Sequence, residues 1–197
     1  MRPICAAALV RSPVLDVRKT ELEGVVEIRP RRLEDERGFF SEVWNQASWA
    51  ESGFAVEFVQ DNHSLSRLPG VLRGLHYQLQ PAAQHKLVRV TRGRVFDVAV
   101  DIRRSSPSFG RWVGAELSAA EWNQLLIPPG FAHGFLTLEP DTEVQYKVSY
   151  PYCAAQDRAI RWDDPSIGIK WPTGGSEFIL SERDQSAPFL RQAELFT

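Results

Sequence analysis

The sequence predicts an all-β protein whose strands close into a jelly-roll barrel with a few short helices. Segments with strand signals are numerous and short, and turn residues separate them, as in small sandwiches and barrels. Helical segments are scarce, and the chain shows neither an internal repeat nor a linker. A chain of 197 residues is long enough to form one domain with its own core.

The strand signals follow one another along most of the chain. The clearest is the segment 94–103, where apolar residues alternate with polar ones from Phe96 to Ile102. This period of two predicts a half-buried strand, with Asp97 and Asp101 on the polar face. The complete set of predicted strands is 25–28, 39–44, 56–60, 71–78, 86–91, 94–103, 112–117, 124–127, 135–138 and 143–150.

Turns and short helices account for the segments between and after the strands. Gly93, Pro107, Gly130 and Pro140 each belong to a segment with turn chemistry. Two short helices are predicted, over 45–51 and over 188–196, and a capping-box sequence over 118–121 predicts a single turn. The predicted organisation is an N-terminal arm, 1–24, and one domain with a C-terminal tail, 25–197.

Composition excludes several classes of protein. A net charge of −2, with 43% apolar and 24% charged residues, is ordinary for a soluble globular protein. It does not indicate binding to nucleic acid or to a membrane surface. The apolar run 4–10 predicts an arm or an edge strand, with a secretory signal as the alternative. Cys5 and Cys153 do not form a disulfide framework, so we expect free thiols in a reducing cytoplasm.

Titratable side chains within the strand patterns predict a polar pocket inside the barrel. Lys86 is in register with Val88, and Tyr146 is in register with Val144. If the valines face inward, the lysine and the tyrosine face inward as well. Such side chains suit a barrel that holds a ligand, because a barrel without one is filled by apolar residues.

Arg73 and His76 do not fit the simple alternation of a strand. Their positions have opposite parity, so a regular strand would place them on opposite faces. Gly74 lies between them, and glycine within a strand often marks a β-bulge. A bulge at this point would allow both side chains to face inward.

Other interpretations of these residues remain open at this stage. A single histidine in a strand is more often structural than catalytic, and a lysine at the start of a strand is usually exposed. A metal site built from His76, His85 and His133 is the main alternative, although the chain contains no His-x-His pair. The sequence also lacks the glycine-rich loops that bind nucleotides and the serine elbow of hydrolases.

Several segments together resemble the dTDP-4-dehydrorhamnose 3,5-epimerase family. The resemblance implies a cupin-type β-barrel without a metal, a homodimer, and dTDP-4-keto-6-deoxyglucose as the substrate. It covers roughly residues 25–190 and lies in order along the chain. The matching segments are 37–42, 60–64, 70–78, 86–89, 93–103, 106–110, 127–135, 146–147, 162–165, 167–169 and 171–172.

The resemblance also implies roles for individual residues. His76 would be the base, Asp184 its partner, and Tyr146 the acid on the other face of the sugar. Lys86 would also be catalytic, and Lys86 and His133 would both line the sugar site. The remaining implied substrate-binding residues, some of them supplied by the neighbouring subunit, are Arg37, Glu42, Gln60, Asp61, Asn62, Arg73, Tyr152, Asp157 and Arg183.

The chain departs from the family pattern at three of these positions. His85 stands where the family usually has glycine, which would place a bulky titratable group beside the sugar pocket. Asp157 stands where glutamate is usual, and Arg183 where lysine is common. These changes leave the expected reaction class intact and affect fine specificity.

The expected chemistry needs neither a redox cofactor nor a metal. In a 4-keto sugar, C3 and C5 both flank the carbonyl, so an anion formed at either carbon delocalises onto the oxygen. A histidine, with an ordinary pKa of about 6.5, is a suitable base, and a lysine can stabilise the enolate. Epimerisation at both carbons or at C3 alone remains open, as do a metal-dependent cupin enzyme and a non-catalytic sugar-nucleotide binding module.

Overall fold

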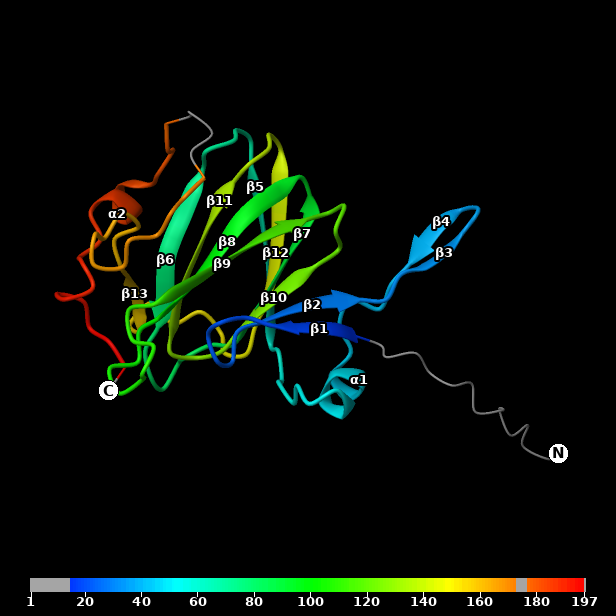
Figure 1. Ribbon diagram of the computed structural model, residues 1–197, viewed down its shortest axis with the longest axis horizontal. Coiled ribbons are helices and arrows are strands. Elements are labelled where there is room, and N and C mark those ends of the chain that lie inside the picture. Colours follow the sequence, from blue (N-terminus) through cyan, green and yellow to red (C-terminus); the bar gives the residue numbers. More distant parts are fainter. Residues whose placement is uncertain (1–14, 173–176, 197) are drawn as a thin grey trace.

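The protein is a barrel of two β-sheets that face each other (Figure 1). The computed structural model describes residues 15–172 and 177–196. The six-stranded sheet has the order β1 (Leu15–Lys19), β2 (Val26–Pro30), β10 (Gln124–Ile127), β7 (Lys86–Arg92), β12 (Thr142–Val148) and β5 (Gln60–Ser66). The five-stranded sheet has the order β13 (Asp157–Ala159), β6 (Leu72–Gln78), β11 (Phe131–Thr137), β8 (Arg94–Asp101) and β9 (Trp112–Ser118). The predicted all-β jelly-roll fold is confirmed.

Three smaller elements lie outside the two sheets in the described part of the chain. A hairpin of β3 (Leu33–Asp35) and β4 (Gly38–Phe40) projects from the body (Figure 1). The helix α1 (Gln46–Glu51) follows it and begins at Asn45, whose side chain accepts from two backbone N–H groups. A second helix, α2 (Glu182–Gln185), lies in the C-terminal segment. In the described part of the chain, no helix has the length and apolar character needed to cross a membrane.

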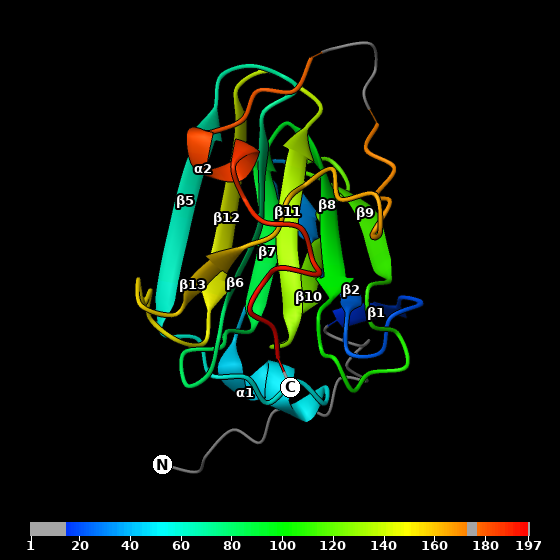
Figure 2. The same ribbon diagram turned by 90° about the vertical axis from the view of Figure 1, so that its left-hand side faces the viewer.

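Apolar side chains pack in three layers. The inner layer, between the sheets, includes Val88 and Val144 from one sheet and Phe135 from the other. The C-terminal segment, residues 160–172 and 177–196, covers the outer face of the five-stranded sheet, as Figure 2 shows, and its residue Leu195 belongs to that outer layer. The helix α1 covers the outer face of the six-stranded sheet with Trp49. Together the layers remove most large apolar side chains from water, which is the main driving force for this fold.

Some predicted strand boundaries were wrong, and packing explains why. The strand predicted over 56–60 is displaced to β5, because Gln60–Ser66 pairs along its whole length with β12. The strand predicted over 135–138 begins earlier, at Phe131, and the one predicted over 39–44 ends at Phe40. The segment 94–103 is not half-buried, since the C-terminal segment covers the face of β8 that carries Val98 and Val100.

The C-terminal and N-terminal predictions also differ from the structure in places. The helix predicted over 188–196 is wrong: the segment makes one turn, closed by Ala193 N to Phe189 O at 3.1 Å, and then runs extended to a bridge with Arg103. The turn predicted over 118–121 is confirmed by a 3.0 Å hydrogen bond from Glu121 N to Ser118 Oγ. Residues 15–19 of the predicted arm form β1, while the apolar run 4–10 and Cys5 lie outside the described residues.

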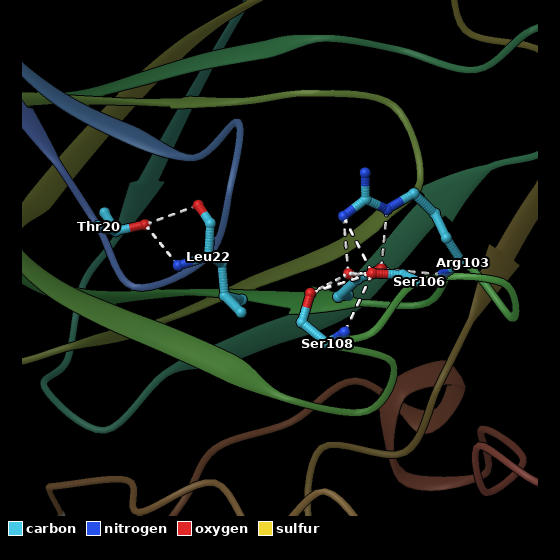
Figure 3. Close-up of polar contacts among 6 residues, drawn as sticks. Thr20, Leu22, Arg103, Ser106 and Ser108 are labelled. Carbon is cyan, nitrogen blue, oxygen red and sulfur yellow. Dashed lines mark hydrogen bonds and ion pairs between the residues drawn. The ribbon is translucent and has the colours of Figure 1, made fainter.

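A buried carboxylate organises the loop after β8. Asp101 accepts hydrogen bonds from Arg103, Ser106 and Ser108, beside the Thr20–Leu22 turn that joins β1 to β2 (Figure 3). Burial alone would raise the pKa of Asp101, but the hydrogen bonds from these three side chains outweigh it and lower the pKa to about 2. The carboxylate is therefore more stable in the folded chain than in the unfolded one.

This shift predicts a pH-dependent loss of stability. Because the folded pKa lies below the ordinary value of 3.8, Asp101 stabilises the fold above pH 4 and loses that contribution as the pH falls toward 2. Asp101→Asn is expected to lower the free energy of unfolding at pH 7 by about 2 kcal/mol, measured by urea denaturation. The difference in the free energy of unfolding between Asp101→Asn and the unmodified protein should become smaller below pH 4.

The matched control is Asp163→Asn. Asp163 pairs with Arg161 at 2.6 Å on the surface, where such pairs contribute about 0–1 kcal/mol. An Asp101→Asn effect no larger than this control, or one that is constant with pH, would contradict the role given to Asp101.

Candidate active site

The barrel holds a cavity of about 480 Å³ between its two sheets. Strands β6, β7, β11 and β12 and the helix α2 supply its walls, so residues far apart in the sequence meet there. As predicted, Lys86 and Tyr146 share the inward orientation of Val88 and Val144. The charged, histidine and tyrosine side chains that line the cavity are Arg73, His76, Lys86, His133, Tyr146, Arg183 and Asp184.

A histidine–carboxylate pair lies in the wall of this cavity. His76 Nε2 is 2.6 Å from Asp184 Oδ1, and Asp184 is buried in the first turn of α2, which Ser181 caps. Burial alone would raise the pKa of Asp184, but the interaction with His76 and the hydrogen bonds from Ser181 and the backbone of Gly74 together outweigh it and lower the pKa. An ionised carboxylate accepts only, so the imidazole nitrogen facing it carries the proton. The other ring nitrogen of a neutral His76 is then unprotonated, as a base requires.

A β-bulge places Arg73 and His76 on the same cavity. His76 lies opposite His133 and Arg73 lies opposite Phe135, so β6 has one residue more than β11 in this stretch. Gly74 provides the bulge with a φ of 129°, and a Cβ there would lie 2.6 Å from the Cα of Gly134. Only glycine fits such a close approach of two strands. The predicted bulge is confirmed.

Lys86 and His133 form the floor of the cavity with a buried aspartate. Lys86 Nζ donates to the backbone oxygen of His76 at 3.3 Å, and burial lowers the pKa of Lys86 to about 8. His133 Nε2 lies 2.9 Å from Asp97 Oδ2. Burial lowers the pKa of His133, and the charge of Asp97 opposes that shift. The floor therefore combines a cation with a histidine that burial keeps neutral.

Tyr146 faces these groups from the opposite sheet. It lies on β12 and contacts the inner apolar layer. Burial raises the pKa of its phenol, the nearby charge of Arg73 lowers it, and the net shift is upward. The phenol is therefore protonated at neutral pH and available as a proton donor.

A second cavity of about 200 Å³ adjoins the first and shares His76, Lys86, Tyr146 and Arg183 with it. Asp157 links its walls, because it accepts from the hydroxyl of Tyr152 at 3.1 Å and pairs with Arg183 at 2.8 Å. Tyr152 is 61% exposed, so its ring can stack on a flat group. The predicted substrate-binding residues that meet in this cavity are Gln60, Asn62, Tyr152, Asp157 and Arg183.

Four residues singled out in the sequence lie elsewhere. Arg37 is at the tip of the β3–β4 hairpin, where it pairs with Asp35. Glu42 accepts from Asn45 and Ser48 near the start of α1. Asp61 pairs with Lys147, and both line a third pocket with Trp44, which shares Tyr146 with the two cavities. His85, which was expected beside the sugar pocket, lines neither of the two cavities and bonds through its backbone to Ser149.

A family model described as dTDP-4-dehydrorhamnose 3,5-epimerase matches residues 19–192. The chain belongs to this family. It is accordingly an isomerase, and the similarity predicted over roughly 25–190 is confirmed.

Relatives within the epimerase family are close in sequence and in fold. A dTDP-4-dehydrorhamnose 3,5-epimerase of Sinorhizobium fredii is 55% identical over 83% of both chains, and one of Shigella flexneri is 52% identical over 92% of this chain and 99% of its own. A Legionella pneumophila 3,5-epimerase, solved with dTDP-4-keto-L-rhamnose, is 44% identical over 90% of this chain and 94% of its own, with a TM-score of 0.86. A Streptomyces bikiniensis 3′-monoepimerase, solved with dTDP-quinovose, is 33% identical over 87% of this chain and 86% of its own, with a TM-score of 0.81.

Two residues of this candidate site were not singled out from the sequence. Asp97 was read as part of the polar face of β8, and its contact with His133 becomes visible only when β8 and β11 pair. Ser64 lines the larger cavity, and its buried hydroxyl has no hydrogen-bond partner among the residues that the structure describes. The alternation of residues in β5 could have indicated Ser64, since it faces the same way as Gln60 and Asn62.

Each histidine of the site contacts a carboxylate and not the other histidine. His76 contacts Asp184, and His133 contacts Asp97. Within residues 15–172 and 177–196, no group of three or more His, Cys, Asp or Glu side chains is arranged to hold a metal ion.

Proposed function

We propose that the protein epimerises dTDP-4-keto-6-deoxyglucose at C3 and C5 in the cytoplasm, by proton removal and return. The observation that supports this most is the single cavity in which His76, Lys86 and Tyr146 meet, with Asp184 behind the histidine. Names of relatives at 52–55% identity support action at both carbons. A 3′-monoepimerase among the structural neighbours makes action at C3 alone the second candidate.

His76 is the proposed base. It takes the proton from the carbon beside the keto group, and the electron pair of that C–H bond moves into the enolate. The charge of Asp184 stabilises the imidazolium that forms. Lys86 is the proposed partner of the enolate oxygen, because a buried ammonium at the cavity floor can stabilise developing negative charge without rearrangement.

Tyr146 is the proposed acid. The enolate is planar at the reacting carbon, so return of a proton from the face opposite the base inverts the centre. Tyr146 lies on the six-stranded sheet while His76 lies on the five-stranded sheet, and both line the same cavity. A protonated phenol on that wall is suited to this step. The phenolate then regains a proton from solvent, and the imidazolium of His76 releases to solvent the proton that it took from the sugar.

The adjoining cavity, together with the wall of the larger cavity that carries Arg73 and Ser64, is the proposed site of the nucleotide. Arg73 is suited to bind the diphosphate, because a guanidinium offers paired donors in a fixed plane. Ser64 Oγ can donate a further hydrogen bond in the same wall. Tyr152 presents an exposed ring on which thymine can stack.

A homodimer is proposed from the β3–β4 hairpin. Its residues Leu33, Phe39 and Phe40 are 51%, 49% and 68% exposed, and exposed apolar side chains gathered on one element indicate an interaction surface. The hairpin lies on the far side of the molecule from α2 and β13, which border the cavities (Figure 1). Arg37, at the tip of this hairpin, therefore reaches a nucleotide site only if that site belongs to a second copy.

The pKa of Lys86 predicts the alkaline limit of activity. Lys86 is charged below its pKa of about 8 and neutral above it. If its charge stabilises the enolate, kcat/KM falls as the pH rises through about 8. The negative charge of Asp97 raises the pKa of Lys86, so Asp97→Asn is expected to move this limit to lower pH. Steady-state kinetics from pH 6 to 10 measure both effects.

Asp163→Asn serves as the control for the pH profile, because Asp163 lies in the C-terminal segment and pairs with Arg161. Its profile should match that of the unmodified protein. If kcat/KM of Asp97→Asn fell at the same alkaline pH as that of the unmodified protein, the pKa of Lys86 would not be the cause of the alkaline limit.

Product formation tests the proposed function directly. The protein is incubated with dTDP-4-keto-6-deoxyglucose, and dTDP-4-keto-L-rhamnose is followed by proton NMR. Formation of this product supports the proposal, and a product inverted only at C3 favours the second candidate. Tight binding of dTDP without any conversion would indicate a non-catalytic binding module. Activity that requires stoichiometric iron, manganese or zinc would favour a metal-dependent enzyme.

A further inference from the structure

The loop between β9 and β10 holds Trp122 in a conformation that large residues rarely adopt. Its φ is 60°, in the left-handed region that normally favours glycine or asparagine. A non-glycine residue persists there only when its surroundings offset the strain. The contacts of this loop therefore show which groups stabilise the conformation of Trp122 and which element its indole contacts.

Asn123 and Ser118 fix the loop from within. The buried side chain of Asn123 accepts from Ser118 N at 3.2 Å and donates to Glu27 Oε1 and to Glu116 O, both at 2.8 Å. Ser118 O accepts from Trp122 N at 3.1 Å. The backbone on both sides of Trp122 is thus tied to β2 and β9, and the indole has a defined direction.

The indole of Trp122 contacts the base of the β3–β4 hairpin. Its Nε1 donates to Ser41 Oγ at 2.9 Å, and Ser41 Oγ donates to Arg31 O at 2.9 Å. This chain of two hydrogen bonds links the two strands of the hairpin where they leave the body. The ring also packs against Phe39, with centroids 4.7 Å apart and an interplanar angle of 75°.

Two further bonds connect the same loop to the chain on either side of the hairpin. Glu121 Oε2 accepts from Arg29 at 2.9 Å before the hairpin, and Gln124 Nε2 donates to Val43 O at 3.0 Å after it. The strands of the hairpin itself are exposed along their length. The direction of the hairpin is therefore determined at its base, by the loop that carries Trp122.

We propose that Trp122 is a positioning residue, which orients the hairpin so that Arg37 enters the nucleotide site of a second copy. This inference rests on the proposed function and on the proposed homodimer. Arg37 is four residues from Ser41, so the extended chain places its backbone about 13 Å from the base. A tilt of about 10° there moves the tip by about 2 Å, which is enough to break a hydrogen bond to a phosphate.

The test compares variants that release the hairpin with a matched control. Trp122→Gly removes the indole and leaves a residue that accepts a positive φ. Ser41→Ala keeps the indole and removes the hydroxyl that accepts from Trp122 and donates to Arg31 O. Trp162→Gly removes an equivalent aromatic pair, since Trp162 and Phe178 lie 4.7 Å apart at 74° in the C-terminal segment. For Trp122→Gly we expect the Kd for dTDP and the KM for the sugar nucleotide to rise about tenfold, the scale of one lost charge-assisted hydrogen bond.

The expected pattern separates positioning from general destabilisation. In Trp122→Gly, kcat should change less than the KM, and Ser41→Ala should show the same effect in weaker form. Trp162→Gly should lower the melting temperature and leave the KM unchanged. An unchanged KM in Trp122→Gly, or an equal rise in Trp162→Gly, would overturn the inference. A monomeric unmodified protein would overturn the proposed homodimer and with it this inference, whereas an inactive unmodified dimer would overturn the proposed function.

A hybrid dimer tests whether the effect acts across the subunits. Trp122→Gly chains are mixed with chains that carry His76→Asn, and the hybrid is isolated by two different affinity tags. Its one working site combines the intact His76 of the first chain with the intact hairpin of the second. That site should show the KM of the unmodified protein. A KM as high as that of the Trp122→Gly dimer would show that the tryptophan acts within its own subunit, against the inference.

Discussion

Replacing His76 with asparagine is expected to reduce epimerisation about 100- to 10,000-fold, the range that a positioned acid–base group contributes. Asparagine retains a hydrogen-bonding side chain of similar width, but it cannot accept a proton at neutral pH. The variant should therefore lose exchange of substrate hydrogen with solvent at both C3 and C5. The measurement is deuterium incorporation, followed by proton NMR. The two proteins are compared at equal concentrations of enzyme that binds dTDP.

His63→Asn is the matched control for His76→Asn. His63 also contacts a carboxylate, Glu143, at 3.0 Å, but it lines the pocket that holds Trp44 and not the proposed sugar cavity. Its exchange rate should remain within about threefold of the unmodified rate, as for a surface change of small free energy. Undiminished exchange in His76→Asn would contradict the role of base.

Replacing Tyr146 with phenylalanine is expected to separate exchange from inversion. Without the phenol, His76 can still remove the proton, and the enolate can take a deuteron back on the same face. Deuterium should therefore enter the substrate with retention, while formation of the epimerised product falls about 100-fold or more. NMR of one sample measures both quantities, because coupling constants report configuration and signal loss reports exchange.

Tyr150→Phe provides the comparison for Tyr146→Phe, because Tyr150 is 41% exposed and lies outside the lining of both cavities. It should epimerise at the unmodified rate. If Tyr146→Phe instead lost exchange and inversion together, the phenol would have a part in the first proton transfer, and the division of roles between the two walls would be wrong.

The strands that build the cavity were predictable because their inner faces carry regular apolar alternation. Lys86 and Tyr146 could be assigned to the interior from their register with Val88 and Val144, and the bulge at Gly74 from the parity of its neighbours. The strand β5 was displaced in the prediction because it is an edge strand with a polar sequence, so pairing with β12 defines it. Periodicity alone carries no information on such pairing.

Contacts between distant segments were the part of the site that the residue pattern could not provide. Asp184 lies 108 residues from His76, in a helix of four residues too short for a periodic signal, and only the family resemblance pointed to it. Asp97 was visible as an alternating polar residue, but solvent exposure is the ordinary expectation for such a residue. The C-terminal segment that covers β8 reverses that expectation, because it makes both faces of the five-stranded sheet internal.

The position of deuterium in the sugar tests the central claim most directly. The unmodified protein is incubated with dTDP-4-keto-6-deoxyglucose in deuterium oxide, and C3 and C5 are followed by proton NMR. The account predicts deuterium at both carbons together with inversion at both. Deuterium confined to C3 would contradict action at C5, and a substrate that binds but takes up no deuterium would contradict proton transfer by His76 altogether.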